Sequence, residues 1–98
     1  MNTIINAIHF DITEKLTAFV NKKIEKLARR CDFVTDAEIN LRVVKPETAL
    51  NKEAAIKLII PGTNDLFASK VADNFEEAVD LCIAALEPQL ERIKEKKQ

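Results

Sequence analysis

The sequence is poor in the residues that most enzyme sites need, with one glycine, one histidine and two cysteines among 98 residues. One glycine excludes the Gly-rich loops that cradle phosphates and the glycine fingerprints of dinucleotide sites. A metal site needs three or four ligands at workable spacing, whereas His9, Cys31 and Cys82 lie far apart in sequence. No Ser or Cys motif accompanies His9, which is interpreted as a polar strand-end residue or a phosphate contact. We therefore expect no catalytic residue, metal, cofactor or small-molecule substrate.

Long apolar runs and a basic N-terminal leader are also missing. The longest unbroken apolar run, residues 81–86, is far shorter than the roughly 20 residues that span a membrane. No Lys or Arg precedes Lys15, so the charged start of a secretory signal is absent. Cys31 and Cys82 form no disulfide framework, and their places on apolar helical stripes predict buried, inert thiols in a reducing cytosol. We expect a cytoplasmic protein without a membrane partner, forming one domain over residues 1–98.

Hydrophobic periodicity divides the chain into four strands and two helices. Ile-rich or alternating stretches predict strands at residues 3–10, 37–43, 53–60 and 66–72. One helix is predicted from Thr13, its N-cap, to about Arg30, and another begins at Asp73 or Asn74 and continues to the end of the chain. Pro88 lies inside the second helical pattern and is expected to kink that helix or split it in two.

The order of these elements predicts an α+β fold of the βαβββα type. Short connections, a polar loop at residues 45–51 and a turn at residues 61–64, favour an antiparallel meander for the last three strands. The helical crossover makes the first strand parallel to a neighbour. Each helix carries one apolar stripe, so both should cover the same face of a four-stranded mixed sheet.

A net charge of −1 argues against a generic polyanion binder, but the charge is unevenly distributed. Residues 13–30 hold six basic and two acidic side chains, a net charge of +4. At about 100° per residue, the six lie on one arc opposite the apolar stripe. They are Lys15, Lys22, Lys23, Lys26, Arg29 and Arg30. Clustered cations repel one another, which indicates a surface for ribosomal RNA or another phosphate ligand, against the alternative of a merely basic, solvated helix face.

Two further features of charge and shape bear on that interpretation. Phe19 falls among the cations and is interpreted as a flank of the core rather than a base-stacking platform. Residues 74–98 hold four basic and six acidic side chains, a net charge of −2. Their basic side chains gather in a tail at about residues 92–98, where cations also complement a helix C-terminus, so the tail contacts RNA only by association.

Three stretches resemble the ribosome hibernation promoting factor family, whose members are also called ribosome-associated translation inhibitors or sigma modulation proteins. Residues 5–16, INAIHFDITEKL, resemble the opening strand and the turn into the first helix. Residues 54–62, AAIKLIIPG, and 66–68, LFA, resemble the third strand, turn and fourth strand. Residues 72–81, ADNFEEAVDL, resemble the junction into the final helix. Their order and spacing together make the chain similar to this family. Since the chain stops soon after the last helix, it resembles the short forms, which lack the dimerising C-terminal domain of long forms.

The resemblance implies the same fold and a non-catalytic function. It implies binding to the small ribosomal subunit across the channel for mRNA and tRNA, with translation blocked by occlusion. Basic residues of both helices would then meet ribosomal RNA phosphates. The positions that match are Lys22, Lys23, Lys26, Arg29 and Arg30 in the first helix, and Arg92, Lys94, Lys96 and Lys97 at the end of the second.

The sequence departs from the family pattern at several positions. Ala7 stands where glycine is usual, and Ile8 where a polar or basic residue is usual. Basic residues are also usual at Ala85, Pro88 and Glu91, so the basic side of the last helix is about half depleted. The second hypothesis is therefore a protein-interaction module of the same fold that has lost RNA binding and uses its acidic last helix or its open sheet face. A small enzyme built around His9 is the third.

Overall fold

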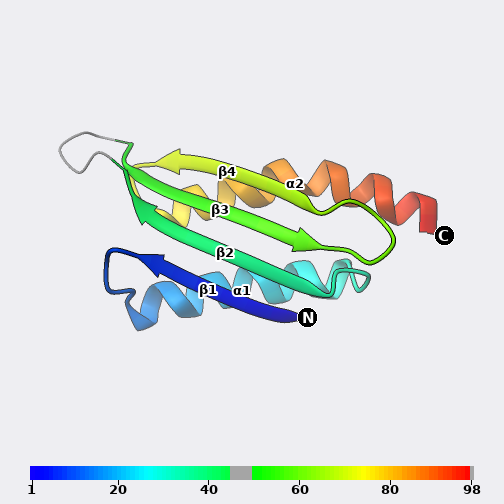
Figure 1. The fold of residues 1–98 in the computed structure, drawn as a ribbon, viewed down its shortest axis with the longest axis horizontal. Helices are drawn as coiled ribbons and strands as arrows, with labels where there is room; N and C mark the ends of the chain where they lie inside the picture. The colour runs from blue at the N-terminus through cyan, green and yellow to red at the C-terminus, as the bar shows by residue number, and fades with distance from the viewer. Residues whose placement is uncertain (45–49, 98) are drawn as a thin grey trace.

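The computed structural model describes residues 1–44 and 50–97, with side chains described through residue 96, and forms a sheet covered on one face by two helices (Figure 1). The elements are β1 (Asn2–Ile8), α1 (Glu14–Arg30), β2 (Asp36–Val43), β3 (Lys52–Ile59), β4 (Leu66–Ala72) and α2 (Phe75–Lys97). The predicted βαβββα order is confirmed. Residues 45–49 of the predicted polar loop lie outside the described residues.

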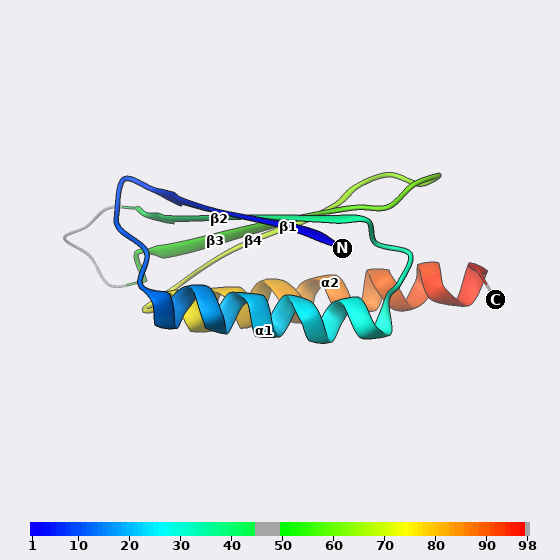
Figure 2. The same cartoon turned by 90° about the horizontal axis from the view of Figure 1, so that it is seen from below.

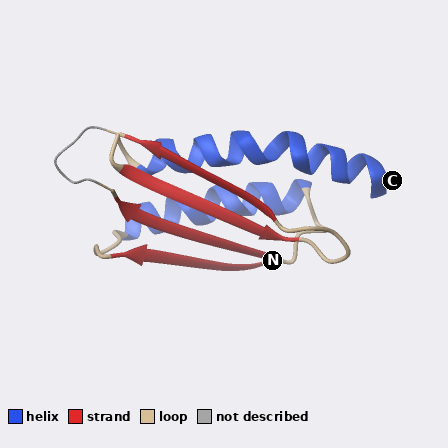
Figure 3. Cartoon of the chain, turned by 45° about the horizontal axis from the view of Figure 1, so that its top comes forward, coloured by secondary structure: helices blue, strands red, loops and turns tan. Residues whose placement is uncertain are grey.

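The sheet has the predicted mixed topology, with its strands in the order β1-β2-β3-β4. Strand β1 pairs with β2 in parallel, whereas the β2–β3 and β3–β4 pairs are antiparallel (Figure 3). The register places Ile39 of β2 between Ile5 of β1 and Ile56 of β3. This apolar row faces the helices because side chains alternate between the two faces of a strand.

Both helices lie on the same face of the sheet, as predicted (Figure 2). The core between the layers includes the fully buried side chains of Val20 from α1, Ile39 from β2 and Leu86 from α2. Burying an aliphatic side chain of this size contributes about 1.5–3 kcal/mol, so the two apolar stripes account for how the helices dock. The opposite face of the sheet is open and exposes Ile4 on β1 and Phe67 on β4.

Side-chain caps set the N-termini of both helices. The backbone N–H of Leu16 donates a hydrogen bond to Thr13 Oγ1 at 3.1 Å, which confirms Thr13 as the N-cap of α1. The N–H of Glu77 donates to Asn74 Oδ1 at 2.7 Å, so Asn74 caps α2. Asp73 instead accepts a hydrogen bond from the N–H of Leu50 at 2.9 Å. Each cap satisfies one of the N–H groups that a helix leaves without an internal partner.

Strand β1 ends at Ile8, two residues before its predicted end. His9 has a φ of 63°, a left-handed conformation that is incompatible with a strand. The chain turns there and brings the ring of Phe10 onto that of Phe75, with ring centroids 4.8 Å apart. A contact between residues so distant in sequence is a tertiary effect that local periodicity cannot reveal.

Helix α2 is a single helix through Pro88, so the predicted alternative of two separate helices is wrong. Pro88 has no N–H to donate to the carbonyl of Ala84. Ala84 is exposed, and water can hydrogen-bond to that carbonyl instead. Leu86 and Leu90 are buried on either side of Pro88 and hold both halves of the helix against the sheet.

Candidate RNA-binding surface

Helix α1 separates an apolar face from a basic face, as its sequence predicts. Leu16, Val20, Ile24 and Leu27 are buried against the sheet. The basic side chains face outward, and all except the half-buried Lys23 are exposed. They are Lys15, Lys22, Lys23, Lys26, Arg29 and Arg30. The basic face is therefore accessible to an anionic partner over the length of the helix.

Carboxylates of α2 neutralise part of this basic face. Lys23 Nζ lies 3.1 Å from Asp80 Oδ1. Arg30 reaches two carboxylates, with Nη1 3.4 Å from Glu87 Oε2 and Nη2 3.1 Å from Glu91 Oε1. The hydrogen bond and the Coulomb attraction of Glu87, followed by the hydrogen bond of Glu91, raise the pKa of Arg30. We call Asp80, Glu87 and Glu91 the acidic row.

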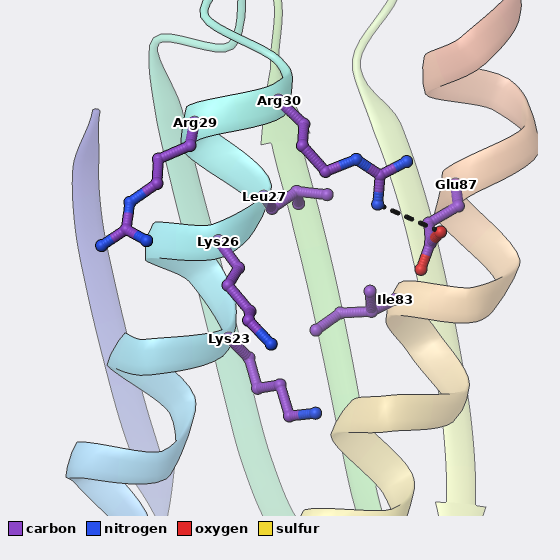
Figure 4. Close-up of a pocket in the computed structure, with 7 residues that line it drawn as sticks. All are labelled: Lys23, Lys26, Leu27, Arg29, Arg30, Ile83 and Glu87. Carbon is purple, nitrogen blue, oxygen red and sulfur yellow. Dashed lines mark hydrogen bonds and ion pairs between the residues drawn. The ribbon is translucent and has the colours of Figure 1, made fainter.

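A groove of about 500 Å³ runs between α1 and α2 (Figure 4). Leu27 and Ile83 give it an apolar floor, and the other lining residues are Lys23, Lys26, Arg29, Arg30 and Glu87. Arg30 extends across the groove towards Glu87, whereas Arg29 points away from α2. Because Arg30 and Lys23 are already paired with carboxylates, only Lys26 and Arg29 among the cations lining the groove have no ion pair within the described residues.

Four cations of α1 lie outside these pairs within the described residues: Lys15 near the start of the helix, and three others farther along it. Lys22, Lys26 and Arg29, here the outer stripe, form no ion pair within the described residues. Their spacing of four and three residues places them on one side of the helix over about 10 Å. They are the part of α1 whose positive charge is available to a partner outside the chain.

Phe19 serves the core rather than the surface, which confirms the prediction made for it. Its ring is half-buried and packs against the hydrophobic core. The ammonium group of Lys23 lies 5.4 Å from the ring centroid, within range of a cation–π interaction. Lys23 is thus held by a ring of its own helix as well as by Asp80 of α2.

The basic residues at the end of α2 do not join the basic face of α1 as one cluster. Burial raises the pKa of Cys31 at the end of α1, and the charges of Arg30 and Lys94 oppose that rise. Arg92 and Lys96 are each two residues from Lys94 and lie about 200° away around the helix axis, on its opposite side. The side chain of Lys97 lies outside the described residues.

The other candidate residues from the sequence take structural positions. Cys31 and Cys82 are buried free thiols, as predicted, and burial raises the pKa of Cys82 to about 11. His9 is exposed at the end of β1. Within residues 1–44 and 50–97, no group of His, Cys, Asp or Glu side chains could hold a metal ion. In the same part of the chain, no helix is long and apolar enough to cross a membrane.

The pairing of the acidic row with cations of α1 is the feature of this surface that the sequence did not predict. The sequence predicts an external anion as the partner of the α1 cations. In the structure, two of these cations, Lys23 and Arg30, instead pair with carboxylates of α2. A signal was present, because six acidic residues lie on α2 and both helices were predicted on one sheet face. Which flank of α2 faces α1 could not be read from either helix alone.

The chain is similar to known proteins over nearly its whole length. Residues 3–98 match the family model described as sigma 54 modulation protein / S30EA ribosomal protein. The chain is 31% identical over 97 residues to a ribosome hibernation promotion factor of Bacillus subtilis, covering 98% of this chain and 50% of that protein. It is 26% identical over 98 residues to a ribosome hibernation promoting factor of Pseudomonas putida, covering 100% of this chain and 91% of that protein. The chain thus spans half of the first relative and most of the second.

Two solved structures share the fold. A ribosomal subunit interface protein from Coxiella burnetii superposes with a TM-score of 0.83 at 24% identity, over 96% of this chain and 98% of that one. The N-terminal domain of Thermus thermophilus Protein Y superposes with a TM-score of 0.74 at 25% identity, over 95% of this chain and 99% of that one. The fold of this chain is therefore shared with both solved structures.

Proposed function

Because the chain belongs to the sigma 54 modulation protein / S30EA ribosomal protein family, we propose that it is a hibernation factor that binds the small ribosomal subunit. In this proposal it occupies the channel for mRNA and tRNA and blocks translation by occlusion, without catalysis and without a cofactor. It acts in the cytoplasm, where ribosomes are. The observation that carries the proposal is the outer stripe, which presents three exposed cations on one helix side.

The proposed contact is electrostatic and directed at ribosomal RNA phosphates. The main contact area is on α1, and a second area lies at the end of α2. The residues proposed to contact RNA are Lys22, Lys23, Lys26, Arg29 and Arg30 in the first area, and Arg92, Lys94, Lys96 and Lys97 in the second. Lysine and arginine contacts to phosphate release counterions, so such binding weakens steeply with salt.

Sedimentation of the protein with purified small ribosomal subunits tests this proposal. Neutralising the outer stripe in Lys22→Gln/Lys26→Gln/Arg29→Gln removes three phosphate contacts and should lower the affinity on the order of 100-fold at about 0.1 M salt. The matched control, Arg42→Gln/Lys57→Gln/Lys70→Gln, makes the same charge change on β2, β3 and β4. We expect the control to bind within about threefold of the wild type, because long-range charge effects are largely screened at this ionic strength.

Two results would overturn the proposal. A wild-type protein that stays in the ribosome-free fraction, both with purified subunits and in a stationary-phase lysate, does not bind ribosomes. Equal losses of affinity in the two triple variants would mean that α1 makes no specific contact.

The acidic row favours a second candidate function, a protein-interaction module that no longer binds RNA. Three carboxylates of α2 already neutralise two cations of α1, which leaves less positive charge for RNA. Such a module would bind a protein partner through α2 or the open sheet face and keep that partner at high salt. Release from ribosomal particles by salt, with no protein partner retained, excludes it.

A further inference from the structure

The acidic row borders the basic face of α1 across the space between the two helices. Its three carboxylates sit on the side of α2 that faces α1, and their side chains are 50%, 41% and 53% exposed. They are therefore accessible to solvent and to any anion that approaches the groove. Along this flank of α2, negative charge faces the basic side of α1.

A phosphate entering the groove would meet cations that are already partly neutralised, because two of the four that line it are paired with carboxylates. It would approach Glu87, which lines the groove beside Arg30. To bind that phosphate, Arg30 and Lys23 would have to exchange carboxylate partners for a phosphate partner. RNA releases condensed counterions when protein cations neutralise its phosphates. A cation that must first give up a carboxylate partner gains less from such a contact, so it adds little to the affinity for RNA.

We propose that Asp80, Glu87 and Glu91 are specificity-determining residues that weaken the attraction of the interhelical groove for RNA phosphates by holding Lys23 and Arg30 in ion pairs, so that the outer stripe carries most of the α1 contact. The inference rests on the proposed function and deepens it. Non-specific RNA binding is almost entirely electrostatic, so pairing Lys23 and Arg30 inside the molecule reduces that contribution. Binding then depends on a partner whose shape presents phosphates to one side of α1 only.

The middle of α2 lacks basic side chains that could bind phosphate. Ala84 and Pro88 are exposed and uncharged, and Ala85 beside them is half-buried. The basic residues of α2 begin only at Arg92, beyond the acidic row. The middle of α2 therefore offers carboxylates on one flank and uncharged side chains on another, and neither attracts phosphate.

Neutralising the acidic row, in Asp80→Asn/Glu87→Gln/Glu91→Gln, tests the inference. The probe is a fluorescent single-stranded oligouridylate, a generic RNA that lacks the folded shape of the ribosomal subunit. Releasing two cations should steepen the slope of log affinity against log salt by about 1.4 and raise the affinity on the order of 10-fold at about 0.1 M salt. Affinity for purified small subunits should change less, so the preference for the subunit over oligouridylate falls.

The matched control is Glu76→Gln/Glu77→Gln/Glu95→Gln, which changes the net charge equally on the same helix. None of these three carboxylates forms an ion pair within the described residues. The control should leave the salt slope for oligouridylate unchanged. Should the triple acidic-row variant fail to fold by circular dichroism, Glu87→Gln/Glu91→Gln frees Arg30 alone and should steepen the slope by about 0.7.

The outcomes separate this inference from the proposed function. Equal changes in oligouridylate binding for the acidic-row and control variants would overturn the inference, because net charge alone would then account for them. Weaker or unchanged oligouridylate binding by the acidic-row variant would overturn it too. Failure of the wild type to bind small subunits would overturn the proposed function, while the oligouridylate comparison still decides what the acidic row does.

Discussion

The buried thiol of Cys82 makes the stability of this fold depend on pH in the alkaline range. Its side chain is fully buried, and its Sγ lies 3.2 Å from the carbonyl oxygen of Ala54 and 3.7 Å from that of Ala68. The thiol can donate its proton to the nearer carbonyl, whereas a thiolate would face two oxygens with partial negative charge. Burial accordingly raises the pKa of Cys82 to about 11.

The sign and size of the effect follow from proton linkage. The pKa of the thiol is higher in the folded state than the unfolded value of about 8.5, so its contribution to stability is full below about pH 8.5 and is lost as pH rises through about 11. The whole loss is about 3 kcal/mol, and near pH 10 the free energy of unfolding should fall by about 1 kcal/mol per pH unit. That loss is a substantial part of the roughly 5–15 kcal/mol that stabilises a domain of this size.

Urea denaturation between about pH 8 and pH 10.5, followed by circular dichroism, measures this dependence. The comparison variant is Cys82→Ala, which lowers stability at every pH by leaving a small cavity but has no thiol to ionise. Lysines titrate in both proteins, so the difference between their slopes isolates Cys82. Equal slopes for the two proteins would refute the reasoning, since they would mean that the folded state tolerates the thiolate.

Two further predictions concern the ends and the middle of the helices. Pro88→Ala supplies the N–H that the carbonyl of Ala84 lacks. The substitution should raise the free energy of unfolding, measured by urea denaturation, by about 1–3 kcal/mol. No gain in stability would mean that α2 is already relaxed around the proline. Thr13→Ala removes the acceptor for the N–H of Leu16 and should cost about 1 kcal/mol, whereas Thr13→Ser should keep most of that stability. Equal losses in the two Thr13 variants would show that the methyl group, not the hydroxyl, matters there.

Local signals predicted the fold well where side chains near in sequence determine it. Helix α1 begins and ends within a residue of its predicted bounds, because the Thr13 cap and the apolar spacing lie in one continuous stretch. Strand β4 spans Leu66–Ala72, as predicted. Its bounds could be predicted because a turn in the sequence precedes the strand and a helix cap follows it. The topology followed from connection lengths and from the single apolar stripe of each helix.

Local signals failed where distant residues decide the conformation. The positive φ of His9 is linked to the stacking of Phe10 on Phe75, more than sixty residues away. Proline strongly disfavours a helix interior, yet the burial of Leu86 and Leu90 keeps α2 in one piece around Pro88. In both cases tertiary packing outweighs a local preference of a few kcal/mol.

The candidate surface was predictable in composition but not in how its charges pair. A helical wheel places the cations of α1 on one arc, yet it treats them as equivalent. The structure divides them by pairing: Lys23 and Arg30 are paired with carboxylates of α2, while Lys22, on the outer stripe, is exposed. Since a paired cation adds little to phosphate binding, the net charge of +4 overstates what α1 offers to RNA. If the proposed function is correct, the outer stripe, rather than the total charge of the helix, therefore determines how strongly α1 binds RNA and from which side RNA must approach.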